Sequence, residues 1–525
     1  MDAQVRTGFV TASAAASGAP SRRRWLVLLA MVAGLFMPML DLMVVNVALP
    51  TIQRDLSAGI SGLQWIVDGY TLAFAALLLT GGILGDRYGR RRIFLAGLVA
   101  FTAASALSGL SQTTAELIAT RALQGVGAAL LVPGTLSIIA ATFSGRERGM
   151  AIGVWGAVSG LAVAIGPVIG GLLVVHTSWR SVFFLNVPVG LAALALALAV
   201  VPDSRDDSCS RRLDMQGLAT GTAAVTALTY GLIEGNTRGW SDPWIVASLV
   251  MAGLLFAAFI AIEARRSAPM LPLAFFRNPT FSAANVVGAL LFFAMIGSVF
   301  FLTLYLQNVN GYTPEAAGIR LLPFSGMILL LAPIAGRTAG RSGSRWLMTV
   351  GPLLLAIGLG LLLRTAPQTA YGTGILPAFL VMGAGWAITL APMTTAVMSS
   401  VSPDRAGVAS AVANTSRELG GVLGVAALGA VVTAAFGPAL QSNLMKAGVA
   451  HAQAVALVAR AGTQAVTGGD PPAGSAVITR AIQQSFVDAM HVGLWMAIAA
   501  AGTAALVSAS FVRRQLAPEM ARRGH

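Results

Sequence analysis

The sequence has one cysteine, Cys209, and one lysine, Lys446, in 525 residues. A single cysteine excludes an internal disulfide bond and any Cys-x-x-Cys metal or redox centre. The chain also has neither the GxxxxGK[ST] pattern of an ATP-binding phosphate loop nor an HExxH metal-binding pattern. These absences argue against an ATP-driven pump and against a metalloenzyme. We therefore expect no enzymatic activity, no catalytic or metal site and no cofactor.

Charged residues are scarce as well. They make up 10% of the chain, whereas 56% of it is hydrophobic and the mean hydropathy is +0.77. This composition excludes a soluble globular protein and indicates an all-α polytopic protein of a lipid bilayer. The net charge of +14 does not indicate a nucleic-acid partner, because the arginines lie in short segments beside apolar runs.

Long apolar runs make up most of the sequence. With about 20 residues per membrane-spanning helix, they predict fourteen helices. The predicted ranges are 25–49, 62–84, 93–111, 116–141, 149–175, 181–201, 214–234, 243–262, 283–307, 318–336, 346–363, 374–400, 407–436 and 489–512. Residues 1–24 and 513–525 are predicted to be cytoplasmic tails, since the first apolar run is too long for a signal peptide.

The basic residues predict the orientation. With the amino terminus in the cytoplasm, 24 of the 34 basic residues fall in cytoplasmic segments, seven outside and three within helices. Three of the seven lie in one long outer loop, 437–488, where the positive-inside rule is weakest. Both termini are therefore expected in the cytoplasm. The excess of arginine over lysine suggests a GC-rich bacterial genome, and hence a bacterial cytoplasmic membrane.

Internal repetition divides the chain. Two glycines of the fourth predicted helix, Gly125 and Gly127, recur 258 residues later, and Arg87 and Arg91 recur after 254 residues. This spacing predicts an N-terminal six-helix half at 25–201, two inserted helices within 202–275 and a C-terminal six-helix half at 276–512. Parallel halves with a substrate site between them near the midplane are a secondary-transporter architecture.

A dense charged turn lies between the second and third predicted helices. Its residues are Gly82, Asp86, Arg87, Gly89, Arg90 and Arg91. Glycines allow a tight turn, and the arginines mark a cytoplasmic face. Asp86 is placed to accept hydrogen bonds from a helix start or to pair with an arginine.

Five segments resemble the major facilitator superfamily, and more closely its fourteen-helix drug:proton antiporter family. The segment from Gly82 to Arg91 resembles the superfamily's loop motif, and Arg121-Ala-Leu-Gln-Gly-Val-Gly127 its fourth-helix motif. The antiporter motif of the fifth helix is matched by Gly166, Pro167, Gly170 and Gly171. Two further segments, from Leu40 to Pro50 and from Gln64 to Tyr70, resemble the fourteen-helix family specifically.

The second copies of two motifs depart from the pattern. Gly340 stands where the first loop motif has Asp86, so we expect no equivalent gating contact there. Val425 stands where the fifth-helix motif has Pro167, which leaves an antiport-specific bend to the first half.

Four charged residues within predicted helices are candidates for proton and substrate coupling: Asp41, Asp68, Arg121 and Glu418. A carboxylate at membrane depth needs a partner, a proton or a water-lined cavity. The alternatives are a capping or pairing role near the outer mouth for Asp41, a helix-start carboxylate for Asp68 and a strut to backbone carbonyls for Arg121. Arg121 has an apolar counterpart, Phe379, in the second half, so repeat symmetry does not require it. The resemblance implies a part in proton relay for it.

Two mechanical roles are expected. Gly166, Pro167, Gly170 and Gly171 would let the fifth helix bend and approach its partner closely, with plain packing as the alternative. Asp86 and the nearby arginines would latch the cytoplasmic side closed, with topogenic charge as the alternative.

Together these features predict proton-coupled efflux of amphipathic, cationic drugs or antibiotics by alternating access. Small molecules, protons and the bilayer are the expected partners, and no feature implies an envelope protein. The alternatives are a dedicated exporter of one metabolite or siderophore, and a non-transporting membrane receptor or regulator.

Overall fold

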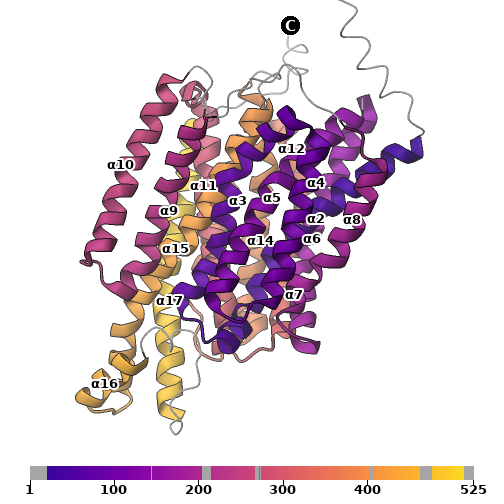
Figure 1. Cartoon of the computed structure of the whole chain (residues 1–525). Helices are drawn as coiled ribbons and strands as arrows, with labels where there is room; N and C mark the ends of the chain where they lie inside the picture. The colour runs from indigo at the N-terminus through magenta and orange to yellow at the C-terminus, as the bar shows by residue number, and fades with distance from the viewer. Residues whose placement is uncertain are drawn as a thin grey trace, which may run out of the picture.

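The computed structural model describes residues 21–143, 145–203, 214–266, 271, 273–401, 406–461 and 476–512, and these form helices joined by short connections. Each of the fourteen predicted ranges coincides largely with helix, and the range 181–201 is divided between two helices (Figure 1). The first group is α2 (Ser21–Leu56), α3 (Ile60–Tyr88), α4 (Arg90–Leu110), α5 (Thr114–Thr142), α6 (Gly145–His176), α7 (Ser181–Phe184) and α8 (Asn186–Val200). Next come α9 (Met215–Arg238) and α10 (Pro243–Arg265). The last group is α11 (Pro279–Leu304), α12 (Pro314–Ser342), α13 (Arg345–Leu362), α14 (Leu376–Ser399), α15 (Ala406–Lys446), α16 (His451–Ala461) and α17 (Ala476–Phe511).

Local sequence sets several helix starts. Thr113 caps α5 by accepting a hydrogen bond from the amide of Glu116, whose carboxylate in turn accepts one from the amide of Gln112. Asp242 and Asn278 cap α10 and α11 in the same way, each followed by proline in the first turn. These side chains satisfy amides that have no partner within the helix.

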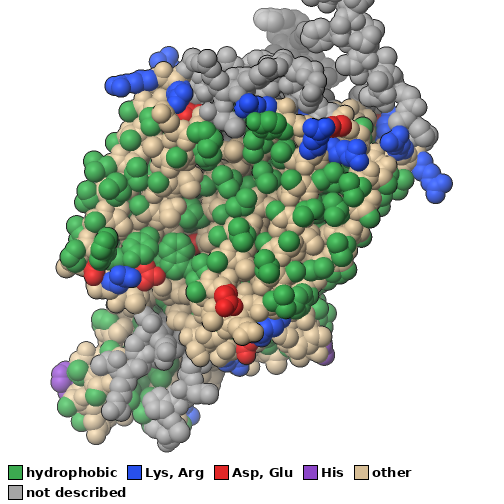
Figure 2. All heavy atoms as spheres, viewed as in Figure 1, with side chains coloured by type: hydrophobic (Ala, Val, Ile, Leu, Met, Phe, Trp, Pro, Cys, Tyr) green, Lys and Arg blue, Asp and Glu red, His purple; other side chains and the backbone are tan. Residues whose placement is uncertain are grey.

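The helices are long and apolar enough to cross a bilayer. Eleven helical stretches within the described ranges meet this criterion by length and composition, and the prediction of a multi-pass membrane protein is confirmed. Figure 2 shows apolar side chains over the middle of the visible face, with charged side chains gathered towards its upper and lower edges. Large apolar residues such as Trp244 and Leu506 are about 70% exposed, which fits lipid contact rather than water contact.

Two groups of helices pack in the same pattern. In the first bundle, which we define as α2 to α8, Gly125 and Gly127 pack against α3 and α4. In the second bundle, α11 to α17, the glycines 258 residues later pack against α12 and α13. A methyl group added at Gly127 would lie 2.7 Å from the Cα of Phe101, and one added at Gly385 would lie 2.6 Å from the amide nitrogen of Leu355. The repeated glycines therefore make equivalent close helix contacts.

The two ends of the molecule differ in how the bundles meet. We call them the Gly89 end, where α3 and α12 finish, and the α16 end. One apolar core, the shared core, joins both bundles towards the α16 end and includes Leu49, Phe300 and Val432. Towards the Gly89 end each bundle has a core of its own, centred on residues such as Phe94 in the first and Phe281 in the second.

Polar contacts between the bundles lie at the α16 end as well. The Gln64 amide donates to the carbonyl of Val425 at 2.9 Å, and the Gln307 amide donates to that of Val47 at 2.8 Å. The structure is therefore closed at the α16 end.

The predicted long loop at 437–488 contains helix, and its place outside the membrane stays a prediction. α15 continues to Lys446, α16 follows, and α17 begins at Ala476, while residues 462–475 lie outside the description. Polar residues end an apolar run, but they do not end a helix once it leaves the bilayer. Leu440 and Phe486 belong to the shared core, and their packing supports the extra turns.

Candidate functional site

A buried ion pair between α2 and α5 forms the centre of the candidate site. Arg121 pairs with Asp41, and their side chains are 1% and 0% exposed. The Arg121 guanidinium also donates to Gln124 Oε1 at 2.8 Å and to the carbonyl of Ile66 at 3.2 Å. Its central carbon lies 4.2 Å from the ring centroid of Tyr70. Arg121 thus holds α2, α3 and α5 together within the first bundle.

Two amides complete the shell of Asp41. Gln124 donates to Asp41 Oδ1 at 2.9 Å, and Asn186 of α8 donates to the same oxygen at 3.2 Å. Asn186 also donates to Ser105 of α4 at 3.0 Å. The sequence analysis did not single out Asn186. The sequence feature that could have identified it is an amide side chain at the start of an otherwise apolar helix, because such a group needs hydrogen-bond partners at membrane depth.

Asp68 lies apart from this ion pair. Its residue is 0% exposed, and neither carboxyl oxygen has a hydrogen-bond partner within the part of the chain that the structure describes. It lies on α3 one turn after Gln64, which hydrogen-bonds to α15, and one turn before Leu72, which belongs to the same apolar cluster as Val422 of α15. Residues four apart share a helix face. Asp68 is therefore on the face of α3 that meets the second bundle.

Glu418 brings a carboxylate from the second bundle towards the same region. It is half-buried on α15, the helix that α3 meets at Gln64. The neighbouring Arg417 hydrogen-bonds to Asn414, and its guanidinium lies 5.7 Å from the Phe292 ring centroid. The two side chains make no ion pair within 4.0 Å among the described residues, as expected from their divergence on the helix.

The glycines of the fifth-helix motif make close contacts on two sides of α6. Gly166 packs on α2, where an added methyl group would lie 2.5 Å from the Cβ of Met43. Gly171 packs on α12 of the second bundle, where it would lie 2.5 Å from the Cα of Glu315. Gly170 also packs on α2, and Pro167 lies inside the helix, next to Gly318 of α12. The motif therefore forms part of the contact between the bundles.

The charged turn is less of a loop than predicted. α3 continues to Tyr88 and α4 begins at Arg90, so Gly89 alone separates them, with φ +108°. The positive φ explains the glycine. Gly82 lies within α3 and the side chain of Asp86 is outside the described part of the structure, so the predicted latch stays a prediction.

The arginines of this turn contact the first bundle itself. Arg91 donates to the carbonyl of Leu198 at 2.7 Å, and Arg92 lies 3.6 Å from a carboxylate oxygen of Asp203. The guanidinium of Arg87 lies 4.8 Å from the Tyr88 ring centroid, and Arg90, the first residue of α4, also takes part in an interaction.

Residues 31–425 match the family model described as Major Facilitator Superfamily. The chain belongs to the Major Facilitator Superfamily. It is 37% identical to the Tetracenomycin C resistance and export protein of Streptomyces glaucescens over 493 residues, which cover 93% of this chain and 91% of that protein. It is 38% identical to the multidrug resistance protein Stp of Mycobacterium tuberculosis over 432 residues, 81% of this chain and 79% of that one.

Solved structures support the superfamily fold. An inward-facing, occupied bacterial homologue of the human lysosomal transporter Spinster has a TM-score of 0.64 and 19% identity, with 95% of this chain and 100% of that one covered. The predicted all-α fold and the predicted superfamily of drug and antibiotic exporters are both confirmed. Within the described residues, no group of three or more His, Cys, Asp or Glu residues is arranged to hold a metal ion.

Proposed function

We propose that this major facilitator protein exports amphipathic drugs or antibiotics across a bacterial cytoplasmic membrane in exchange for protons, acting as a transporter and not as an enzyme. The observation that carries the coupling is the contrast between two buried carboxyl groups of the first bundle. Asp41 is neutralised by Arg121, whereas Asp68 has no partner among the described residues. The relatives named as resistance and export proteins support the direction of transport.

The contrast assigns different roles to the two groups. Asp41 pairs with Arg121, and this pair fixes the geometry around Tyr70. Burying a neutral carboxyl group between apolar helices costs much less free energy than burying a charged carboxylate. Asp68 therefore carries the proton while the α16 end is closed, and Glu418 supplies negative charge for a cationic substrate.

The packing of the two bundles supports alternating access. The distribution of basic residues supports a cytoplasmic location for the Gly89 end and both termini. In this orientation the closed α16 end faces the outside. Rocking of the bundles about the α6–α12 and α3–α15 contacts would open the α16 end and expose Asp68 to outside protons. For exchange, the drug binding from the cytoplasmic side displaces the proton of Asp68 to the cytoplasm, and reprotonation of Asp68 from outside accompanies drug release.

Proteoliposomes test the proposal. Ethidium efflux is measured under an imposed pH gradient for the parent protein, for Asp68→Asn and for Glu116→Gln, an exposed carboxylate at the start of α5 that serves as the control. We expect gradient-driven efflux in the parent and the control, and its loss in Asp68→Asn. Efflux in Asp68→Asn that still follows the pH gradient as in the parent would remove Asp68 as the proton carrier.

A dedicated exporter of one metabolite is the second candidate. The observation in its favour is the 37% identity to a relative named for a single antibiotic, over 93% of this chain. Absence of ethidium movement, with gradient-driven efflux of one antibiotic, would favour this candidate.

A further inference from the structure

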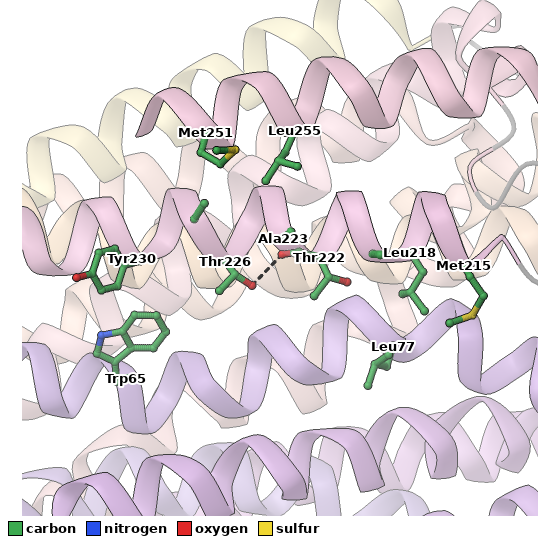
Figure 3. A pocket seen from close by; sticks show the side chains of 12 residues that line it. Trp65, Leu77, Met215, Leu218, Thr222, Ala223, Thr226, Tyr230, Met251 and Leu255 are labelled. Atoms are coloured by element: carbon green, nitrogen blue, oxygen red, sulfur yellow. Dashed lines mark hydrogen bonds between the residues drawn. The ribbon is translucent and has the colours of Figure 1, made fainter. Parts of the chain in front are cut away.

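The helices α9 and α10, which follow the first bundle and precede the second in the sequence, form a long surface trough together with α3. Its floor is one face of α9, where small residues such as Ala219, Ala223 and Ala227 recur at helical spacing. Trp65 and Leu77 of α3 form one wall, and Met251 and Leu255 of α10 the other (Figure 3). The trough has a volume of about 720 Å³.

The trough has the dimensions of a lipid-like chain. It extends along α9 from Met215 to Tyr230, which at 1.5 Å per residue is about 22 Å. The hydrocarbon core of a bilayer is about 30 Å thick. The outer side of α10 is apolar and exposed, with Leu254 and Val250 more than half exposed, so the hairpin faces lipid. A hydrocarbon chain would lie in the trough parallel to its neighbours in the bilayer.

One end of the trough is aromatic and acidic. Tyr230 and Trp65 lie there, and Glu234 follows Tyr230 by one helical turn. Glu234 Oε1 accepts hydrogen bonds from Ser61 at 2.7 Å and from the Trp65 indole at 3.1 Å. Over the described ranges, Oε2 accepts no hydrogen bond and Glu234 has no ion pair within 4.0 Å. The carboxylate is held in place by neutral donors. Its negative charge has no cationic partner within 4.0 Å among the described residues, so it can pair with a cationic ligand.

We propose that this trough is a binding site for cationic amphiphiles with one long alkyl chain. The alkyl chain lies along the small residues of α9, and the ammonium head lies at Glu234 beside Trp65 and Tyr230. A carboxylate and two aromatic rings at the bilayer interface favour a cation, whereas they disfavour the phosphate of an ordinary phospholipid. This inference deepens the proposed function by naming a ligand class, and it concerns a site separate from the Asp41–Arg121 pair.

Equilibrium binding tests the site without transport, so the site and the proposed export can fail separately. The full chain is reconstituted in nanodiscs of zwitterionic lipid and titrated with hexadecyltrimethylammonium carrying bromine on the chain, which quenches nearby tryptophan. Hexadecanol brominated in the same way is the neutral ligand. Trp65→Phe identifies the part of the quenching that comes from Trp65.

Two variants separate charge from shape. Glu234→Gln keeps the acceptor for Ser61 and Trp65 but removes the charge, and we expect about three- to tenfold weaker binding of the cation with unchanged binding of the alcohol. Ala227→Leu fills the floor, and we expect both ligands to bind more weakly. Glu116→Gln is the charge control, with parental binding expected.

Two outcomes overturn the inference. If Ala227→Leu weakens both ligands while Glu234→Gln weakens neither, the trough holds acyl chains without selecting a cation. If neither variant changes the quenching assigned to Trp65, no ligand occupies the trough. Parental binding in a protein that exports nothing would instead contradict the proposed function and leave the site intact.

Discussion

The buried Asp41–Arg121 pair makes a quantitative prediction about stability. Asp41→Asn keeps the shape of the side chain and removes its charge. Arg121, only 1% exposed, would then keep neutral partners alone: the Ile66 carbonyl, Gln124 and the Tyr70 ring. Removing one member of a buried ion pair costs about 3–5 kcal/mol, because the other charge is left uncompensated. At 1.4 kcal/mol per factor of ten, the unfolding equilibrium shifts roughly 100- to 4,000-fold.

A double-mutant cycle measures this coupling. The free energy of unfolding is measured by denaturant titration in detergent, with tryptophan fluorescence, for Asp41→Asn, Arg121→Gln and the double variant. We expect the double variant to lose less than the two single losses together, with a coupling of about 2–3 kcal/mol. The exposed Asp55–Arg180 pair, at 2.7 Å, is the matched control and should couple by less than about 1 kcal/mol.

The reasoning fails on one result. If the two single losses add to within about 0.5 kcal/mol, the ion pair does not hold the first bundle together. Asp41 would then be free to take up protons directly, and its role would have to be exchanged with that of Asp68.

Three further predictions follow from single contacts. Asp68→Asn should leave the free energy of unfolding unchanged or raise it, because the carboxyl group has no partner in the described structure; denaturant titration checks this. In Gly171→Ala the added methyl group would lie 2.5 Å from α12, so the contact between the bundles should loosen. Cysteines introduced at the α16 end in a Cys209→Ser background should then be labelled faster. Gly253→Ala, whose methyl group has nothing within 4 Å, is the control and should not change the labelling. Gly89→Ala should cost about 1–3 kcal/mol of stability, because φ is +108° and the Asp203 carboxylate lies 2.8 Å from the added methyl group. The unfolding titration used for Asp68→Asn measures this cost.

Sequence predicts much of the fold because apolar run length is a direct consequence of bilayer thickness. It predicts helix ends poorly where helices leave the bilayer, as at Lys446 and Ala476, since helix formation there depends on packing with Leu440 and Phe486. It also misses Gly89 as the single break between α3 and α4, because arginine is a good helix former.

The sequence predicts individual residues of the candidate site but not which of them contact one another. Asp41 and Arg121 are both evident as charges within apolar helices, yet they are 80 positions apart and nothing local indicates that they pair. Glu234 was not singled out at all, because a carboxylate near the end of a predicted span is normally a solvated interface residue. Its bonds to Ser61 and Trp65, more than 160 positions away, require the folded hairpin.

The division of the apolar core determines how a core substitution affects the stability of each conformation in the transport cycle. A cavity made in a core that belongs to one bundle, for example at Phe94 or Phe281, weakens that bundle equally in every conformation of the transport cycle. A cavity in the shared core, for example at Phe300, in addition weakens the conformation in which the bundles touch at the α16 end. Substitutions that remove the same side-chain volume therefore fall into two classes. One class lowers the amount of folded protein, and the other also changes the relative populations of the conformations in the transport cycle.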